Sequence, residues 1–333
     1  MKASANLFSR MVSRALTVCA LVAGLGLTAC NDDDESVAQP TQQNIVQLAQ
    51  GNANLSTLVA AVQKADLVTT LSGTTQLTVF APTNDAFSQL PAPFNNAQNI
   101  TAITNTADIA TLRNILLYHV TAGDVKAADL RAQAYTTQAA APNNNIYVSK
   151  PAAGGVFING NTRVTTADVD ASNGVVHVID RVLMPPSQSI AQIVTARASA
   201  STNPEFTLLL QALQRPAAAP ILTAAASQTG NVTVFAPTDA AFRALLGNAQ
   251  LSSVSDADLT AILSRHVIGT GRVFSTDLAP GTVATLGGNV TIAAAGTGFT
   301  VRGASGTAAN ITAANILATN GVVHVIDQVI RPN

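Results

Sequence analysis

The sequence of 333 residues contains two cysteines, no tryptophan and three tyrosines, and only 11% of its residues are charged. With so few Trp and Tyr side chains, the chain lacks the aromatic platforms on which bases commonly stack. Its formal net charge is −1 and no cluster of Lys and Arg occurs, so the positive surface that nucleic-acid binding requires is missing. These absences exclude a nucleic-acid-binding protein.

Sequence signatures of catalysis and of metal binding are missing as well. The chain contains no Gly-x-Ser-x-Gly element, which would expose a serine nucleophile, and no His-Glu-x-x-His zinc motif. Its two cysteines do not recur at a ligand spacing, and no acidic cluster is repeated. The sequence therefore predicts that the protein is not an enzyme, and it predicts no catalytic residue, no metal ion and no cofactor.

The first 29 residues have the character of an export signal. Lys2, Arg10 and Arg14 precede an apolar stretch at residues 15–29, which suits a signal peptide and is short for a membrane-spanning helix. The stretch ends in Leu-Thr-Ala-Cys30, which resembles the bacterial lipobox. We therefore predict a lipoprotein signal peptide at residues 1–29 and acylation (palmitate) of the Cys30 thiol.

The residues after Cys30 are polar and acidic, and residues 30–40 are predicted to form a flexible tether. Cys19 lies in the segment that would be removed, so the mature chain would have no disulfide and no free thiol. The protein is expected to be secreted across the inner membrane and held in the cell envelope only by its lipid. Asn31 follows the cysteine in place of the Asp that resembles an inner-membrane retention signal, which favours the outer membrane.

Comparison of the chain with itself reveals an internal repeat. Residues 77–87 recur as residues 232–242, and residues 173–183 recur as residues 320–330. Repeats of this length indicate one domain type used twice in tandem. The boundary falls at the Pro pair 185–186, because consecutive prolines end a strand and stiffen a connector.

The two copies are colinear. His177 follows His119 by the same interval that separates His324 from His266. Before the middle histidine the first copy is longer, and residues 91–106, rich in Pro, Asn and Thr, are expected to form the extra loop. We predict two domains, at residues 41–184 and 187–331.

Each copy has helical periodicity in its first part and alternation in its last part. Apolar residues recur at helical spacing in residues 45–62 and 109–120, whereas residues 146–148, 156–158 and 175–183 read as strands. Helices followed by strands within one compact unit predict an α+β fold.

These blocks resemble the fasciclin domain family. The resemblance rests on the Thr-Val-Phe-Ala-Pro-Thr block, the Tyr-His block and the Asn-Gly-Val-Val-His-Val-Ile-Asp block, which occur in the family's order over residues 41–332. It implies a compact wedge-shaped sandwich of seven strands with packed helices, and a role in adhesion without catalysis. The residues expected to form the structural motif are Phe80, Pro82, Thr83, His177, Asp180, Phe235, Pro237, Thr238, His266, His324 and Asp327.

The four histidines occupy matching positions in the two copies. A zinc site needs three or four ligands. The acids Asp180 and Asp327 lie three positions after His177 and His324, and odd spacing on a strand points side chains to opposite faces. We therefore expect each histidine to make a structural hydrogen bond between helix end and strand. A histidine-dependent metal protein is the alternative interpretation.

Two elements are candidates for partner binding. The family resemblance implies that Asp168 and Val169, ahead of the Asn-Gly turn, and the pair Tyr118 and His119 take part in it. In the second copy Asn315 stands in place of the acid and Arg265 in place of the tyrosine. If only one domain binds a partner, we therefore expect it to be the first.

The expected function is that of a lipid-anchored adhesion or interaction protein at the cell surface or in the periplasm. A protein, a polysaccharide and self-association all fit as its partner. The remaining alternative is a carrier of a small ligand, which would require an apolar cavity between the helices and the sheet.

Overall fold

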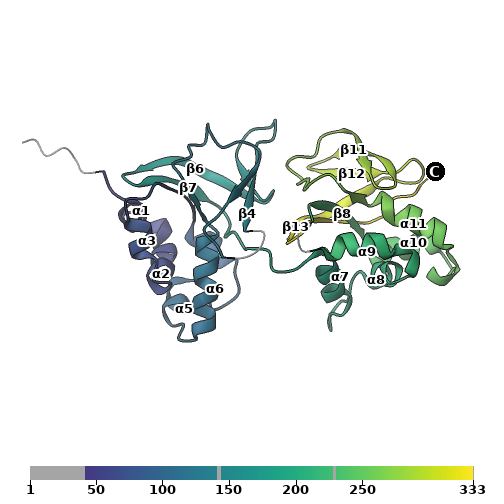
Figure 1. The fold of residues 1–333 in the computed structure, drawn as a ribbon, viewed down its shortest axis with the longest axis horizontal. Helices are drawn as coiled ribbons and strands as arrows, with labels where there is room; N and C mark the ends of the chain where they lie inside the picture. Colours follow the sequence, from purple (N-terminus) through teal and green to yellow (C-terminus); the bar gives the residue numbers. More distant parts are fainter. Residues whose placement is uncertain (1–41, 141–143, 228–229, 333) are drawn as a thin grey trace, which may run out of the picture. The chain divides into compact units, whose positions relative to one another are not determined.

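The computed structural model describes residues 42–140, 144–227 and 230–332, which form two domains of similar build (Figure 1). The predictions for the signal peptide, Cys30 and the tether fall outside the described residues. Within the described ranges no helix is both long and apolar enough to cross a bilayer. The boundary predicted at residues 185–186 lies between the last strand of the first domain and the first helix of the second.

In the first domain all α-helices precede every strand except the first one, which lies between the third and the fourth helix. Its helices are α1 (Ile45–Gln50), α2 (Ser56–Lys64), α3 (Val68–Ser72), α4 (Asn84–Ser88), α5 (Ala97–Thr101) and α6 (Thr106–Leu117). Its strands are β1 (Leu77–Pro82), β2 (Val120–Ala122), β3 (Ala134–Thr136), β4 (Asn145–Ser149), β5 (Phe157–Ile158), β6 (Thr162–Ala171) and β7 (Gly174–Ile179).

The second domain repeats this order. Its helices are α7 (Ile190–Ala198), α8 (Thr207–Leu213), α9 (Ala219–Ala226), α10 (Asp239–Leu246) and α11 (Asp256–Arg265). Its strands are β8 (Val232–Pro237), β9 (Val267–Ile268), β10 (Gly281–Thr285), β11 (Gly288–Ala295), β12 (Gly298–Arg302), β13 (Ala309–Ala318) and β14 (Gly321–Ile326).

Each domain contains one seven-stranded mixed sheet, with the strand order β2-β1-β7-β6-β5-β4-β3 in the first and the matching order in the second. Strands β1 and β7 pair in parallel, whereas the other neighbours are antiparallel. The α+β fold and the seven strands expected from the family resemblance are therefore confirmed. The strands belong to a single sheet whose two ends approach each other, since Thr121 bridges to Thr137 and the amide of Gln138 donates to the carbonyl of Val120 at 2.9 Å.

The central strand β1 is buried on both faces, which explains its unbroken apolar sequence. Val79 belongs to the apolar cluster shared with the helices, whereas its neighbour Phe80 belongs to the cluster enclosed by the curved sheet. Successive side chains of a strand point to opposite faces, so this strand joins the two cores of the domain. In the second domain β8 has the same position, with Phe235 in the inner cluster.

The segment expected to be an extra loop, residues 91–106, contains the short helix α5 instead. The side chain of Asn96 caps this helix by accepting a hydrogen bond from the amide of Asn99 at 2.8 Å, and Ile100 is fully buried. The Asn-rich composition suggested a loop, but Asn is also a favoured residue at the start of a helix.

Candidate functional site

The histidine at the end of the last helix is a buried structural link. His119 lies 2% exposed after α6; its Nδ1 donates to the carbonyl of Ile115 at 2.8 Å, and its Nε2 accepts a hydrogen bond from the amide of Leu183 at 2.8 Å. His266 makes the same two bonds in the second domain, with Ile262 and Ile330. Burial lowers the pKa of both imidazoles to about 4. Each ring is therefore neutral near pH 7, and both of its nitrogens have a hydrogen-bond partner.

The second histidine of each domain ties a loop to the sheet. On β7, His177 donates from Nε2 to the carbonyl of Val125 at 2.9 Å and accepts from the amide of Asp168 at Nδ1. On β14, His324 makes equivalent bonds with Val273 and Asn315. Burial lowers the pKa of both histidines. Among the residues that the structure describes, no group of three or more His, Cys, Asp or Glu side chains could hold a metal ion.

The acids next to these histidines are also structural. Asp180 accepts a hydrogen bond from the amide of Arg163 at 2.8 Å, and Asp327 accepts one from the amide of Asn310 at 2.7 Å. Each carboxylate therefore fixes the start of the long strand, β6 or β13, against the end of the final strand. The structure does not bring either acid together with a histidine nitrogen.

The phenol of Tyr118 and the guanidinium of Arg265 make equivalent hydrogen bonds to a strand carbonyl in the two domains. Tyr118 is fully buried and its hydroxyl donates to the carbonyl of Asn145 at 2.8 Å, while Arg265 donates from Nη1 to the carbonyl of Asn289 at 3.0 Å. Burial raises the pKa of Tyr118. The side chains of Tyr118 and His119 are buried in this structure, so their participation in binding stays a prediction.

The remaining motif residues lie at the end of the central strand and at the start of the helix that follows it. Thr83 and Thr238 cap α4 and α10 by accepting hydrogen bonds from Ala86 and Ala241 at 3.2 and 3.1 Å. Phe80 and Phe235 are fully buried, and Pro82 and Pro237 end the strands β1 and β8.

Sequence reasoning assigned the Asn of the Asn-Gly pair only to a turn, but its side chain has a larger role. Asn173 is 3% exposed; its Oδ1 accepts from the amide of Ile45 at 3.0 Å, and its Nδ2 donates to the carbonyls of Leu71 and Gly73 at 2.9 and 2.8 Å. Asn320 makes equivalent contacts with α7 and α9. The exact repetition of Asn in both copies was the available signal.

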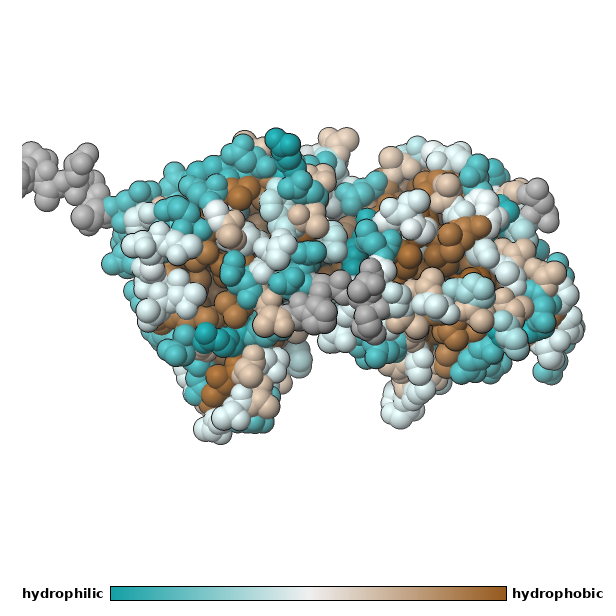
Figure 2. Space-filling model, viewed as in Figure 1, coloured by the Kyte–Doolittle hydropathy of each residue, from teal (hydrophilic) through white to brown (hydrophobic). Residues whose placement is uncertain are grey.

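We call the surface around Asp168, with Asp124, Lys126 and Asp170, the edge surface of the first domain. Asp168 is exposed and has a positive φ of 59° at an irregular point of β6, and its Oδ1 accepts from the amide of Ala127 at 2.7 Å. Lys126 forms ion pairs with Asp170 and Asp124. Figure 2 shows hydrophilic colour over β6. Val169 is half-buried beside it.

The edge surface of the second domain has the same backbone but a different environment. Asn315 has a φ of 62° and its Oδ1 accepts from the amide of Ser275 at 2.8 Å, yet it is only 5% exposed. Its Nδ2 donates to Oδ1 of Asn161, at the turn between β5 and β6 of the first domain, at 2.8 Å. The equivalent of the exposed Asp168 is therefore covered.

Aromatic and cationic side chains complete this contact. The guanidinium of Arg272 lies 4.9 Å from the centre of the Tyr147 ring, and Phe274 lies 5.7 Å from the same ring. Arg272 and Phe274 occupy the positions that Asp124 and Lys126 have in the first copy, where the sequences Gly-Asp-Val-Lys and Gly-Arg-Val-Phe correspond. The edge surfaces of the two copies therefore differ in charge, and they also differ in what surrounds them.

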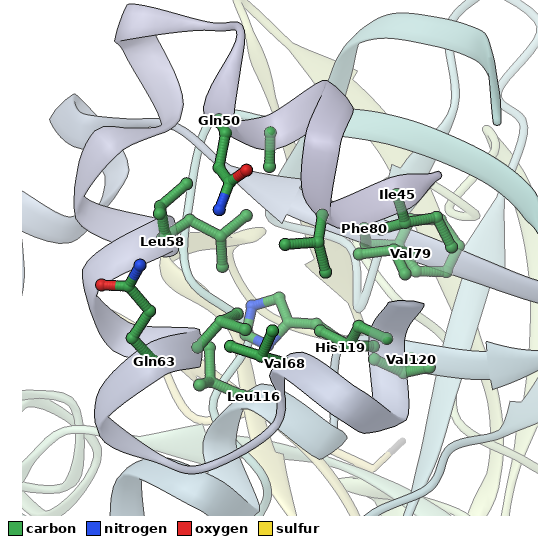
Figure 3. A pocket seen from close by; sticks show the side chains of 15 residues that line it. Ile45, Gln50, Leu58, Gln63, Val68, Val79, Phe80, Leu116, His119 and Val120 are labelled. Atoms are coloured by element: carbon green, nitrogen blue, oxygen red, sulfur yellow. The ribbon is translucent and has the colours of Figure 1, made fainter. Parts of the chain in front are cut away.

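Each domain also contains a small apolar cavity between its helices and its sheet. In the first domain the cavity has a volume of about 30 Å³ and is lined mainly by aliphatic side chains (Figure 3), with Gln50 and Gln63 at its exposed side. His119 also lines it, but both of its ring nitrogens already have partners. A cavity of this size has room for roughly one or two water molecules. It is too small to favour a carrier function.

Comparisons with known proteins match this architecture. The model of the fasciclin domain matches residues 53–185 and 204–332. Protein sll1483 of Synechocystis sp. is 44% identical over 45% of this chain and 77% of its own length. The cell surface glycolipoprotein MPB83 of Mycobacterium bovis is 35% identical over 46% of this chain and 66% of its own length.

One further relative is a much longer protein, and one solved structure contains a pair of such domains. Transforming growth factor-beta-induced protein ig-h3 of Sus scrofa is 28% identical over 79% of this chain, which spans 36% of that protein. A solved domain pair of the insect cell adhesion molecule fasciclin I covers 81% of this chain and 91% of that structure, at 20% identity and a TM-score of 0.35. On the two family matches and the fold, this chain belongs to the fasciclin domain family.

Proposed function

We propose that this protein is a lipid-anchored surface protein of the cell envelope that binds an extracellular or envelope partner through the edge surface of its first domain. Fasciclin domains occur in cell-adhesion and surface proteins. One relative is described as a cell surface glycolipoprotein, which supports the lipid anchor expected at Cys30. The partner is a protein or a polysaccharide.

The observation that carries this proposal is the contrast between the two edge surfaces. Asp168 is exposed, whereas its equivalent Asn315 is covered by the first domain. Asp168 is also held rigidly, since its backbone amide donates to His177 and its side chain bonds to the amide of Ala127. A rigid exposed polar surface loses little conformational entropy when a partner binds.

The anchor and the binding site are tested separately in whole cells. Cys30→Ser is expected to release the protein from the membrane fraction, because the thiol that takes the lipid is gone. Retention of that variant in the membrane fraction would show that the anchor is wrong.

For the binding site, cross-linking on intact cells captures the partner, and captured amounts are compared between the natural protein and Asp168→Ala. Asp85→Ala serves as the matched control, since Asp85 is an exposed acid of the same domain that lies on α4. We expect Asp168→Ala to lower capture at least about tenfold, as the loss of a hot-spot contact does. Equal capture by all three proteins would contradict the proposed site.

A further inference from the structure

The contact between the two domains joins two different surfaces. The first domain contributes its turn surface, which consists of Tyr147 and residues 159–161, and the second contributes its edge surface with Arg272, Phe274 and Asn315. Gly160 lies so close that a Cβ there would be 2.7 Å from Nδ2 of Asn315 and 2.8 Å from Cβ of Phe274. A contact between unlike surfaces is heterologous and has no internal symmetry.

Because the domains are repeats, each has both kinds of surface, and two of the four remain open. One is the edge surface of the first domain. The other is the turn surface of the second domain, formed by residues 303–308 between β12 and β13 together with Arg302 and Arg331. Residues 304–307 and both arginines are exposed. Arg331 lies directly against this turn, since it bridges to Ser305 and its side chain lies beside Gly306.

The two open surfaces carry opposite charge. The edge surface has the three carboxylates of Asp124, Asp168 and Asp170 and the ammonium of Lys126, which gives a net charge of −2. The turn surface has the two guanidiniums of Arg302 and Arg331, and neither forms an ion pair with another described residue. Complementary potentials of this kind favour association and fix its register.

The hydrogen-bonding groups are complementary as well. In the covered edge surface Asn315 donates a hydrogen bond to the incoming turn. At the open edge surface Asp168 is a carboxylate with only acceptors, and one of its oxygens is already used by Ala127. The incoming turn must therefore supply donors, and the guanidinium of Arg331 and the exposed hydroxyl of Thr307 are donors of the required kind.

We propose that copies of this chain associate head to tail, with the turn surface of the second domain of one chain seated on the edge surface of the first domain of the next. This proposal rests on the proposed function, because it names a second copy of the chain as a partner of the same edge surface. The contact would use, between chains, the same two regions of the fold that meet within one chain, with charged side chains in place of the aromatic ones. A heterologous contact leaves one surface open at each end, so it builds chains longer than a dimer.

The test uses the mature chain, residues 30–333, with Cys30→Ser so that no lipid is attached, in sedimentation velocity at increasing concentration. We expect the average mass to rise past that of a dimer, and to fall when salt is added, because exposed charges are screened at high ionic strength. Asp168→Lys and Arg331→Glu, each alone, should weaken association at least about tenfold, since like charges then face each other.

Mixing the two charge-reversal variants gives the decisive result. The Asp168→Lys chain keeps a normal turn surface and the Arg331→Glu chain keeps a normal edge surface, so one natural contact remains. The two altered surfaces carry opposite charges at positions 168 and 331, so they do not repel each other either. The equimolar mixture is therefore expected to associate at a concentration at which each variant alone stays monomeric. Circular dichroism of each variant, with thermal melting equal to that of the natural sequence, shows that folding is intact.

Three outcomes overturn the proposal: a natural chain that stays monomeric, variants that associate as the natural chain does, or a mixture that contains no dimer. The proposed function fails by a different result, which is undiminished capture by Asp168→Ala on cells. A monomeric chain whose capture on cells still depends on Asp168 would contradict self-association and leave the envelope partner standing.

Discussion

The two domains share a set of buried and half-buried polar side chains and differ on their surfaces. The histidines, the Asn of the Asn-Gly turn and the acid after the last strand make equivalent bonds in both domains. By contrast, the edge surface holds Asp168 in one domain and Asn315 in the other, and only the first is open. The repeated residues build the fold, whereas the differing residues of the two edge surfaces have different surroundings.

The largest effect is expected at the buried Asn of the turn. Asn173→Ala leaves one amide and two carbonyls without their partner, and each such buried group costs about 1–3 kcal/mol. We expect a loss of about 4 kcal/mol from the unfolding free energy, and a similar loss for Asn320→Ala. Urea unfolding measures both, with the exposed Asn54→Ala as control. A loss in only one domain would contradict the shared set of polar side chains.

The second effect is a loss of stability in acid that both domains share. An unfolded histidine takes up a proton below pH 6.5, whereas burial holds the pKa of His119 and His266 at about 4. Stability is therefore complete above pH 6.5 and declines as the pH falls toward 4, by about 3 kcal/mol for each of these two residues. His177 and His324, whose pKa is also lowered, act in the same direction.

This pH dependence is measured by urea unfolding at several values between pH 7 and 4. Replacing His266 by Gln should make the decline shallower in the second domain and leave the first unchanged. Constant stability over this range would show that the imidazoles are not held neutral.

The third effect concerns the difference between the domains. Asn315→Asp removes the amide that donates to Asn161 and to Ser275. The hydroxyl of Ser275 can donate to the new carboxylate, but the amide oxygen of Asn161 then faces another acceptor. We expect the contact between the domains to weaken by about 1–2 kcal/mol, while each domain keeps its fold. Small-angle scattering should show a wider distribution of dimensions than in the natural chain, and Asp168→Asn, the reverse change in the first domain, should not.

The smallest effect tests whether the tyrosine and the arginine are equivalent. Tyr118→Phe and Arg265→Met each remove one hydrogen bond to a strand carbonyl. We expect losses of about 1 kcal/mol in each case, as measured by thermal unfolding. A loss limited to Tyr118→Phe would show that Arg265 is not its structural replacement.

Much of the fold could be predicted from the sequence, because the repeated blocks mark the central strand, the last helix and the final hairpin. The structural role of the histidines followed from the lack of further ligands. The role of Asn173 did not, because the Asn-Gly pair is a local turn signal and its partners at residues 45, 71 and 73 are distant in sequence.

The covered position of Asn315 could not be predicted for a related reason. Burial of that residue depends on the turn at residues 159–161, which lies in the other domain. The sequence contained one indication of this burial. The second copy has Arg272 where the first has the acid Asp124, and Phe274 where the first has the cation Lys126. Equivalent positions that hold different residues in the two repeats therefore indicate surfaces with different surroundings.

The most direct test of this account compares the accessibility of positions 168 and 315. A chain of residues 30–333 with Cys30→Ser has no thiol, so Asp168→Cys or Asn315→Cys introduces a single one. Maleimide labelling of the folded protein should be at least about tenfold faster at position 168, because Gly160 and Phe274 enclose position 315. Equal labelling rates at the two positions, with equal rates after unfolding in urea, would contradict the unequal use of the two domains.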